Sequence, residues 1–130
     1  MNRTPKMSRI LRRALVPALI ATVTAASLAW ALHTTLVKAV PAIDGTITTA
    51  PTELTLWFNE RPDVSLSNIV LQGPDSIKIE TGSTKAHTDT LALTALVRGT
   101  MKPGKYTVLY RTAGSDGHVM RGKYQFTLQP

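Results

Sequence analysis

Three histidines are the only imidazole side chains in this 130-residue chain, which contains no cysteine. His118 follows the turn-forming pair Asp116-Gly117, and His33 stands directly after a long uncharged segment. Imidazole nitrogen and carboxylate oxygen donors in a tetragonal plane suit Cu(II), and without cysteine no thiolate site can form. His33, Asp116 and His118 are therefore candidate ligands of a Cu(II) ion. His87 lies in a polar stretch, where we expect it to be exposed to solvent.

Each of these residues also has a simpler interpretation. Asp-Gly pairs are common in hairpin turns without any metal, and a histidine just beyond a leader is often an ordinary residue. Met101 and Met120 are isolated thioethers, which are more typical of packing than of a Cu(I) site. The metal hypothesis depends on whether the predicted fold brings the candidates together.

Short segments with a period of two cover the chain after residue 33. In the stretch 52–58, for example, Leu54, Leu56 and Phe58 fall on one face and Glu53 and Trp57 on the other. Glycine, proline, aspartate and asparagine separate the segments, as is typical of turns. We predict strands at 35–40, 52–58, 66–72, 90–94, 105–111 and 122–128, with weaker candidates at 46–48 and 77–80.

This pattern predicts one all-β domain at 33–130, an immunoglobulin-like antiparallel β-sandwich with Greek-key connections. The turn at 116–118 joins two predicted strands, so it lies at one end of the sandwich. A strand that starts near His33 would begin at that same end. Two imidazoles and one carboxylate would then converge.

Residues 1–32 have the composition of an export signal. A basic stretch is followed by the uncharged run 14–32, which ends with small residues at Ala29 and Ala31. We predict a signal peptide, cut before Leu32 or before His33; the alternative is an uncleaved N-terminal membrane anchor. Either outcome brings the leader into contact with the membrane and places 33–130 outside the cytoplasm.

The net charge of +7 is concentrated in this leader. It holds five of the fifteen basic residues and no acid, which leaves ten basic and eight acidic residues for the rest of the chain. The predicted domain is thus nearly neutral, and it lacks the interleaved basic and aromatic residues of a nucleic-acid surface. We expect no nucleic-acid partner.

Four segments together resemble the CopC family of periplasmic copper-binding proteins. Residues 111–126 (RTAGSDGHVMRGKYQF) are similar to the C-terminal motif of that family, in which Asp-Gly-His precedes a glycine and an aromatic in the last strand. The other three segments, in the family's order, are 33–45 (HTTLVKAVPAIDG), 50–60 (APTELTLWFNE) and 103–108 (PGKYTV).

The resemblance implies that His33, Asp116 and His118 bind Cu(II), and that Glu60 lies beside the site and fixes a ligand or a bound water. It further implies a monomeric copper carrier or buffer that is not an enzyme, with a separate multi-pass membrane transporter as partner. The chain departs from the family in Leu32 ahead of His33, in the extra residue Ile43, and in lacking a methionine-rich loop.

The sequence is also compatible with two other functions. An N-terminal histidine with a second histidine also resembles copper-dependent oxidases and oxygenases, although the neighbouring loops lack the aromatic substrate surface of those enzymes. The same sandwich is also compatible with a metal-free structural module, because a fold does not dictate a function.

Overall fold

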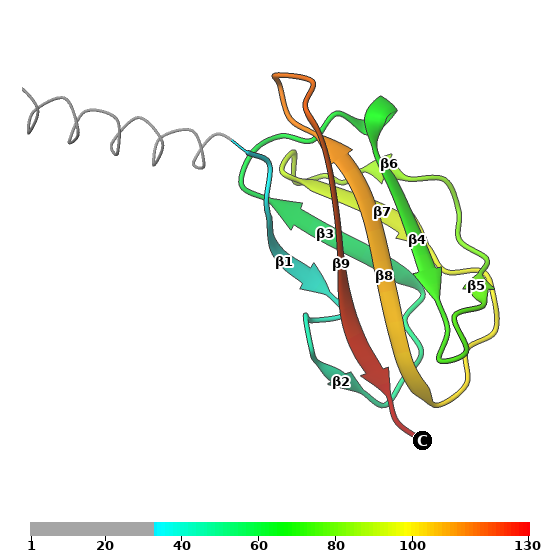
Figure 1. Cartoon of the computed structure of the whole chain (residues 1–130). Coiled ribbons are helices and arrows are strands. Elements are labelled where there is room, and N and C mark those ends of the chain that lie inside the picture. The colour runs from blue at the N-terminus through cyan, green and yellow to red at the C-terminus, as the bar shows by residue number, and fades with distance from the viewer. Residues whose placement is uncertain (1–32) are drawn as a thin grey trace, which may run out of the picture. The chain divides into compact units, whose positions relative to one another are not determined.

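The computed structural model describes residues 33–130 (Figure 1). Residues 34–130 form one compact unit. The predicted leader at 1–32 lies outside the described residues. No helix among the described residues is long and apolar enough to span a membrane.

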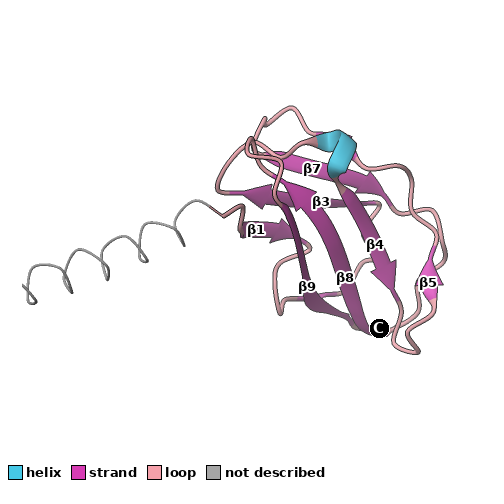
Figure 2. Cartoon of the chain, turned by 45° about the horizontal axis from the view of Figure 1, so that its top comes forward, coloured by secondary structure: helices cyan, strands magenta, loops and turns pink. Residues whose placement is uncertain are grey.

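Residues 34–130 form two β-sheets that pack face to face, as the turned view in Figure 2 shows. One sheet has the order β1-β3-β7-β6, with bounds Leu36–Val40, Glu53–Phe58, Ala92–Leu96 and Lys85–Ala86. The other has the order β2-β9-β8-β4-β5, with bounds Thr46–Ile47, Val119–Leu128, Gly104–Ala113, Asn68–Gln72 and Lys78–Ile79. The predicted all-β sandwich is confirmed.

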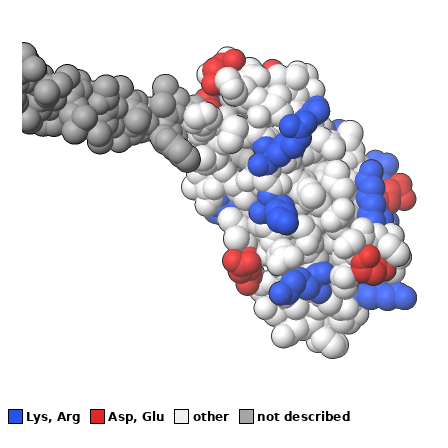
Figure 3. Space-filling model, in the orientation of Figure 1, with Lys and Arg blue, Asp and Glu red and all other residues white. Residues whose placement is uncertain are grey.

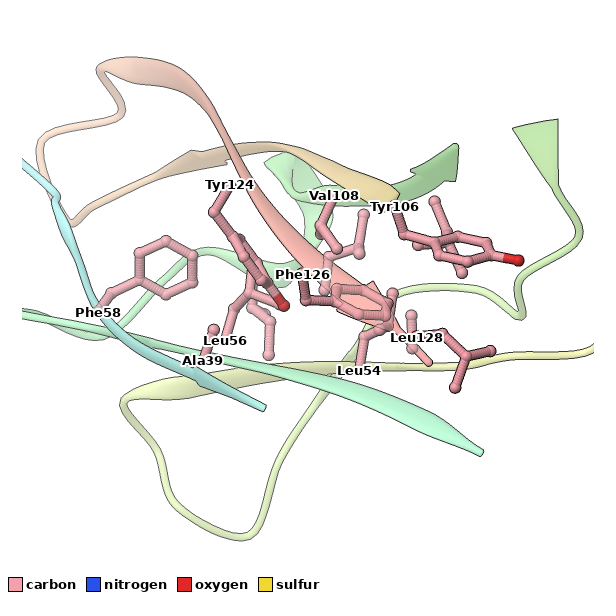
Figure 4. Close-up of a cluster of buried hydrophobic side chains, with 13 residues drawn as sticks. Ala39, Leu54, Leu56, Phe58, Tyr106, Val108, Tyr124, Phe126 and Leu128 are labelled. Atoms are coloured by element: carbon pink, nitrogen blue, oxygen red, sulfur yellow. The ribbon is translucent and has the colours of Figure 1, made fainter. Parts of the chain in front are cut away.

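The core lies between the sheets and is built from the alternating apolar residues of the strands. Leu54, Leu56 and Phe58 are at most 2 % exposed, as the period of two predicts. From the other sheet, the Tyr106 and Phe126 rings stack with their centroids 5.5 Å apart (Figure 4). This continuous apolar layer holds the sandwich together in a domain that has no disulfide.

Three details differ from the sequence prediction. Val64–Leu66 is a short 3-10 helix, η1, because the Asp63 side chain accepts a hydrogen bond from the Ser65 amide at 2.9 Å, so β4 starts only at Asn68. Strand β6 was not predicted, since two residues show no periodicity. The β2 strand pairs with β9 in parallel, whereas all other pairs between strands are antiparallel.

Candidate metal centre

The turn between β8 and β9 carries two of the predicted ligands. The Gly117 amide donates a hydrogen bond to the Gly114 carbonyl at 3.0 Å, and the His118 amide donates to Oδ1 of Asp116 at 3.0 Å. Gly117 has a φ of 74°, a conformation in which glycine avoids the Cβ strain of other residues. Both Asp116 and His118 are exposed. The sequence thus folds locally into a tight turn that presents an imidazole and a carboxylate to solvent.

Glu60 lies at the base of this turn. Its Oε1 accepts a hydrogen bond of 2.6 Å from the hydroxyl of Thr34, which is only 5 % exposed. A side chain at Gly114 would collide with both Glu60 and Thr34, so the three residues are in close contact. Thr34 therefore contacts Glu60, which lies 26 positions later in the chain, and Gly114, which lies 80 positions later. Gly114 is two residues before Asp116.

Hydrogen bonds donated by backbone amides fix the same arrangement. The Thr35 amide donates to Oδ1 of Asn59 at 2.8 Å, and the Asn59 amide donates to the Thr35 carbonyl at 3.1 Å. On the other side, the Asp63 amide donates to the Ala113 carbonyl at 2.8 Å. The connection 59–63 therefore links the start of β1 to the end of β8.

His33 directly precedes Thr34 in the chain and is half-buried. It lies outside the compact unit 34–130, which holds Glu60, Asp116 and His118. Within residues 33–130, no three histidine, aspartate or glutamate side chains form a group that could hold a metal ion. The three-ligand site therefore remains a prediction.

His87 lies closer to this end of the domain than its sequence context suggests. It is half-buried rather than exposed, and its ring packs against Trp57 in a T-shaped arrangement with centroids 5.8 Å apart. Its Nδ1 accepts a hydrogen bond from the Asp89 amide at 3.0 Å. It also lines a depression of about 560 Å³ with the hairpin residues Gly114, Ser115 and Gly117. The expectation of a solvent-exposed His87 is wrong, because the unpredicted β6 hairpin turns its ring onto Trp57.

Two carboxylates near this depression have pKa values below the usual range. Hydrogen bonds from the Ser65 hydroxyl and amide lower the pKa of Asp63. The Leu91 amide is the main cause that lowers the pKa of Asp89, and the Trp57 indole N–H, 3.0 Å from Oδ2, adds to the effect. Both carboxylates stay ionised at neutral pH and serve as acceptors that hold the loops.

Residues 36–129 match the family model described as the CopC domain. The chain belongs to the CopC domain family. This match covers most of the chain and includes the hairpin that carries Asp116 and His118 as well as Glu60, and it stops short of His33. The sequence resemblance is thereby confirmed at the level of the family.

Solved structures and a curated relative agree with membership of the CopC domain family. CopC from Methylosinus trichosporium OB3b matches with a TM-score of 0.69 and 28% identity, over 75% of this chain and 95% of that one. PcoC from Escherichia coli, described as a methionine-rich copper resistance protein, matches with a TM-score of 0.67 and 27% identity, over 75% and 99%. The protein YobA of Escherichia coli K12 is 33% identical over 101 residues, which are 77% of this chain and 81% of YobA.

In this CopC-domain chain, sequence reasoning missed two residues of the candidate centre, Thr34 and Gly114. Neither has a side chain that suggests chemistry, and their contact with Glu60 is visible only in three dimensions. The one available signal was position, since Thr34 follows His33 and Gly114 opens the turn with Asp116 and His118.

Proposed function

We propose that this CopC-domain protein is an exported copper-binding protein that holds Cu(II) through His33, Asp116 and His118. Copper is its cargo, and the protein carries or buffers the ion and does not catalyse a reaction. Glu60 would orient a ligand or a water bound to the metal, as a carboxylate beside a metal site commonly does.

The contact of Thr34 with Glu60 and Gly114 is the observation that carries this proposal. The buried hydroxyl of Thr34, one residue after His33, donates to the Glu60 carboxylate, and the same carboxylate contacts the residue that opens the 114–118 turn. A peptide unit spans 3.8 Å between consecutive Cα atoms. Since Thr34 lies at the base of the 114–118 turn, its neighbour in the chain, His33, is included in the proposed ligand set.

The donor set favours divalent copper. Two imidazoles and one carboxylate supply nitrogen and oxygen atoms, which suit Cu(II) in a tetragonal plane, while soft sulfur ligands select Cu(I). None of the described methionines contributes to the 114–118 turn. The ligands must be deprotonated to bind the metal, so copper affinity should fall as the pH drops.

The relatives suggest the biological setting. PcoC is described as a copper resistance protein, and both matched structures share this sandwich. By this similarity, we assign the chain to copper resistance, homeostasis or delivery to a membrane importer, in a space outside the cytoplasm. The importer would be a separate multi-pass membrane protein.

A pair of histidine variants tests the assignment of the ligands. His118→Gln should weaken Cu(II) binding at least tenfold, about 1.4 kcal/mol, because it removes one imidazole from the turn. His87→Gln is the matched control, and it should leave copper affinity unchanged, since His87 Nδ1 already accepts a backbone amide. Competitive titration of the exported protein measures both affinities. Equal losses in the two variants would refute the ligand set.

The mass of the purified protein, with and without Cu(II), provides the complementary measurement. It reports where the leader is cut and how many copper ions are bound. A single copper per chain is expected. A protein that retained no copper after mild purification would favour a metal-free structural module.

A further inference from the structure

The acidic and basic residues are unequally distributed between the two sheets. Strands β4, β8 and β9, the central strands of the five-stranded sheet, carry no aspartate or glutamate. They carry four cations: Lys105, Arg111, Arg121 and Lys123. Figure 3 shows this face, with basic groups along its middle and acidic groups towards its margins. The outer side of this sheet is therefore positively charged.

The strand register places these side chains in rows across the sheet. Asn68 of β4 pairs with Arg111 of β8, which pairs with Arg121 of β9. The next row on the same face of the sheet consists of Val70, Leu109 and Lys123. Side chains two residues apart on a strand share a face, and all of the polar members of these rows are exposed. The first row thus holds three side chains with nitrogen donors. The neighbouring row holds two aliphatic side chains and a third cation.

The two arginines lie directly opposite each other, where like charges destabilise a sheet. Among the described residues, neither arginine is ion-paired with a carboxylate that would offset this repulsion. Nε of Arg111 donates to the Leu66 carbonyl at 3.2 Å, which fixes the direction of its guanidinium and leaves both terminal nitrogens available. The pair is therefore partly pre-organised and has no internal counter-charge.

A depression of about 410 Å³ coincides with this pair. It is lined by Arg111, Arg121, Asn68, Val70, Leu109 and Tyr110. A protruding cation on a flat surface serves general solubility, whereas two guanidinium groups beside a depression can enclose a single group. The depression offers room for a ligand, and the uncompensated positive charge favours a ligand that is anionic.

We propose that Arg111 and Arg121 form a binding site for a phosphate group, which is either free phosphate or the headgroup of a lipid. The planar guanidinium donates two parallel N–H groups, which match the oxygen spacing of phosphate. Opposed residues on adjacent strands have Cβ atoms about 5 Å apart, so both forks can reach one tetrahedral ion. A dianion neutralises both charges, which a single carboxylate does not. Asn68 offers its amide at the other end of the row.

Nuclear magnetic resonance of the arginine Nε–H groups tests this site in the purified, metal-free protein. Inorganic phosphate is titrated against chloride at constant ionic strength. The signals of Arg111 and Arg121 should shift and saturate, while that of Arg98 should not move. Arg121→Gln should weaken the affinity at least tenfold, and Arg121→Lys should weaken it too, because the charge remains but the fork is lost. Lys85→Gln is the matched control, because it removes one exposed cation from the four-stranded sheet. This variant should bind phosphate as the wild type does.

A second arm identifies the source of the phosphate. Vesicles of phosphatidylcholine with phosphatidic acid are compared with vesicles of phosphatidylcholine alone in a co-sedimentation assay. Saturable binding of inorganic phosphate that Arg121→Gln abolishes supports a site for the free ion. Binding to the phosphatidic acid vesicles alone, lost in the same variant, supports a lipid headgroup. The proposal is overturned if neither probe binds, if acetate saturates the site equally well, or if Lys85→Gln weakens binding as much as Arg121→Gln. Circular dichroism of each variant confirms that the fold is intact.

Discussion

Gly114 has a specific steric reason to be a glycine. A Cβ atom at this position would lie well inside contact distance of the Glu60 carboxylate and the Thr34 hydroxyl. Both of these groups are held by their mutual hydrogen bond of 2.6 Å and cannot move apart without breaking it. A side chain at position 114 would therefore disrupt the contact between Thr34 and Glu60, which holds the start of β1 beside the 114–118 turn.

Gly114→Ala should lower both stability and copper affinity. We expect a loss of about 1–3 kcal/mol in the free energy of unfolding, as is usual for overpacking, together with weaker Cu(II) binding. Chemical denaturation and copper titration measure the two effects. Gly82→Ala is the control, because a Cβ at Gly82 would meet only atoms at 3.5 Å or farther. A Gly114→Ala protein as stable as the wild type would show that this contact is not tight.

Two buried tyrosines differ in what their hydroxyl groups contact. The Tyr106 hydroxyl donates to the Lys102 carbonyl at 2.7 Å and accepts from the Lys102 amide at 2.8 Å. The Tyr124 hydroxyl has no hydrogen-bond partner within the described residues, and it lies among apolar side chains (Figure 4). A buried hydroxyl without a partner loses its hydration and gains nothing in return.

Replacing each tyrosine by phenylalanine should therefore change stability in opposite directions. Tyr124→Phe should raise the free energy of unfolding by about 1 kcal/mol, and Tyr106→Phe should lower it by about the same amount. Urea denaturation of both variants beside the wild type measures the difference. If Tyr124→Phe proved the more destabilising of the two, the Tyr124 hydroxyl would have to contact a bound water or another polar group.

At the scale of the elements, the long hairpin β8–β9 forms the centre of the larger sheet. Ten residue pairs join its two strands, and β4 covers the other edge of β8. By contrast, β5 and β6 are strands of two residues at the sheet edges. The free energy of local opening should therefore be high in the hairpin and low in the edge strands, since few contacts hold the edge strands.

Amide hydrogen exchange should show this order directly. The amides of β8 that bond to β4 or β9 should exchange most slowly, close to the rate set by global unfolding, while those of β5 and β6 should exchange orders of magnitude faster. Exchange followed by two-dimensional spectra measures each site. Comparable protection in β6 and β8 would contradict the assignment of β6 as a weak edge.

Patterns along single elements explain which parts could be predicted from the sequence. The strand at 52–58 is visible because Leu54, Leu56 and Phe58 alternate, and the 116–118 turn is visible from Asp-Gly. The predicted strand 66–72 began two residues too early, because Leu66 ends the η1 helix and only the Asp63 cap shows this. Contacts such as Thr34 with Glu60 join distant residues, and no local pattern encodes them. The Cu(II) ligands stay a prediction for the same reason.

For the molecule as a whole, the tyrosines also determine how stability depends on alkaline pH. Burial raises the pKa of Tyr124 well above its usual range and raises the pKa of Tyr110 as well. In the unfolded chain both phenols ionise near pH 10. The unfolded state then loses protons that the folded state keeps, so the contribution of these tyrosines to stability is complete well below pH 10 and decreases as the pH rises through this value.

The wild type should thus lose stability between pH 9 and pH 11, and Tyr124→Phe should lose less over the same interval. A fully buried phenol contributes up to about 1.4 kcal/mol per pH unit in this range. Denaturation midpoints at pH 8, 10 and 11 for both proteins give the comparison, in which lysine titration cancels. Identical slopes would mean that the Tyr124 phenol ionises as freely in the fold as outside it.

The parallel pairing of β2 with β9 also has a mechanical consequence. Three backbone hydrogen bonds of 2.8–2.9 Å join residues 44–47 to residues 125–129, from the Asp44, Thr127 and Gln129 amides. When force is applied to the chain before β2 and to Pro130, the parallel strands β2 and β9 are pulled in opposite directions along their length. All of these bonds then bear the force together. An antiparallel hairpin pulled from its open end instead breaks one bond at a time. Tension across the domain would therefore meet its greatest resistance at this short clamp, after β1 has peeled away from β3.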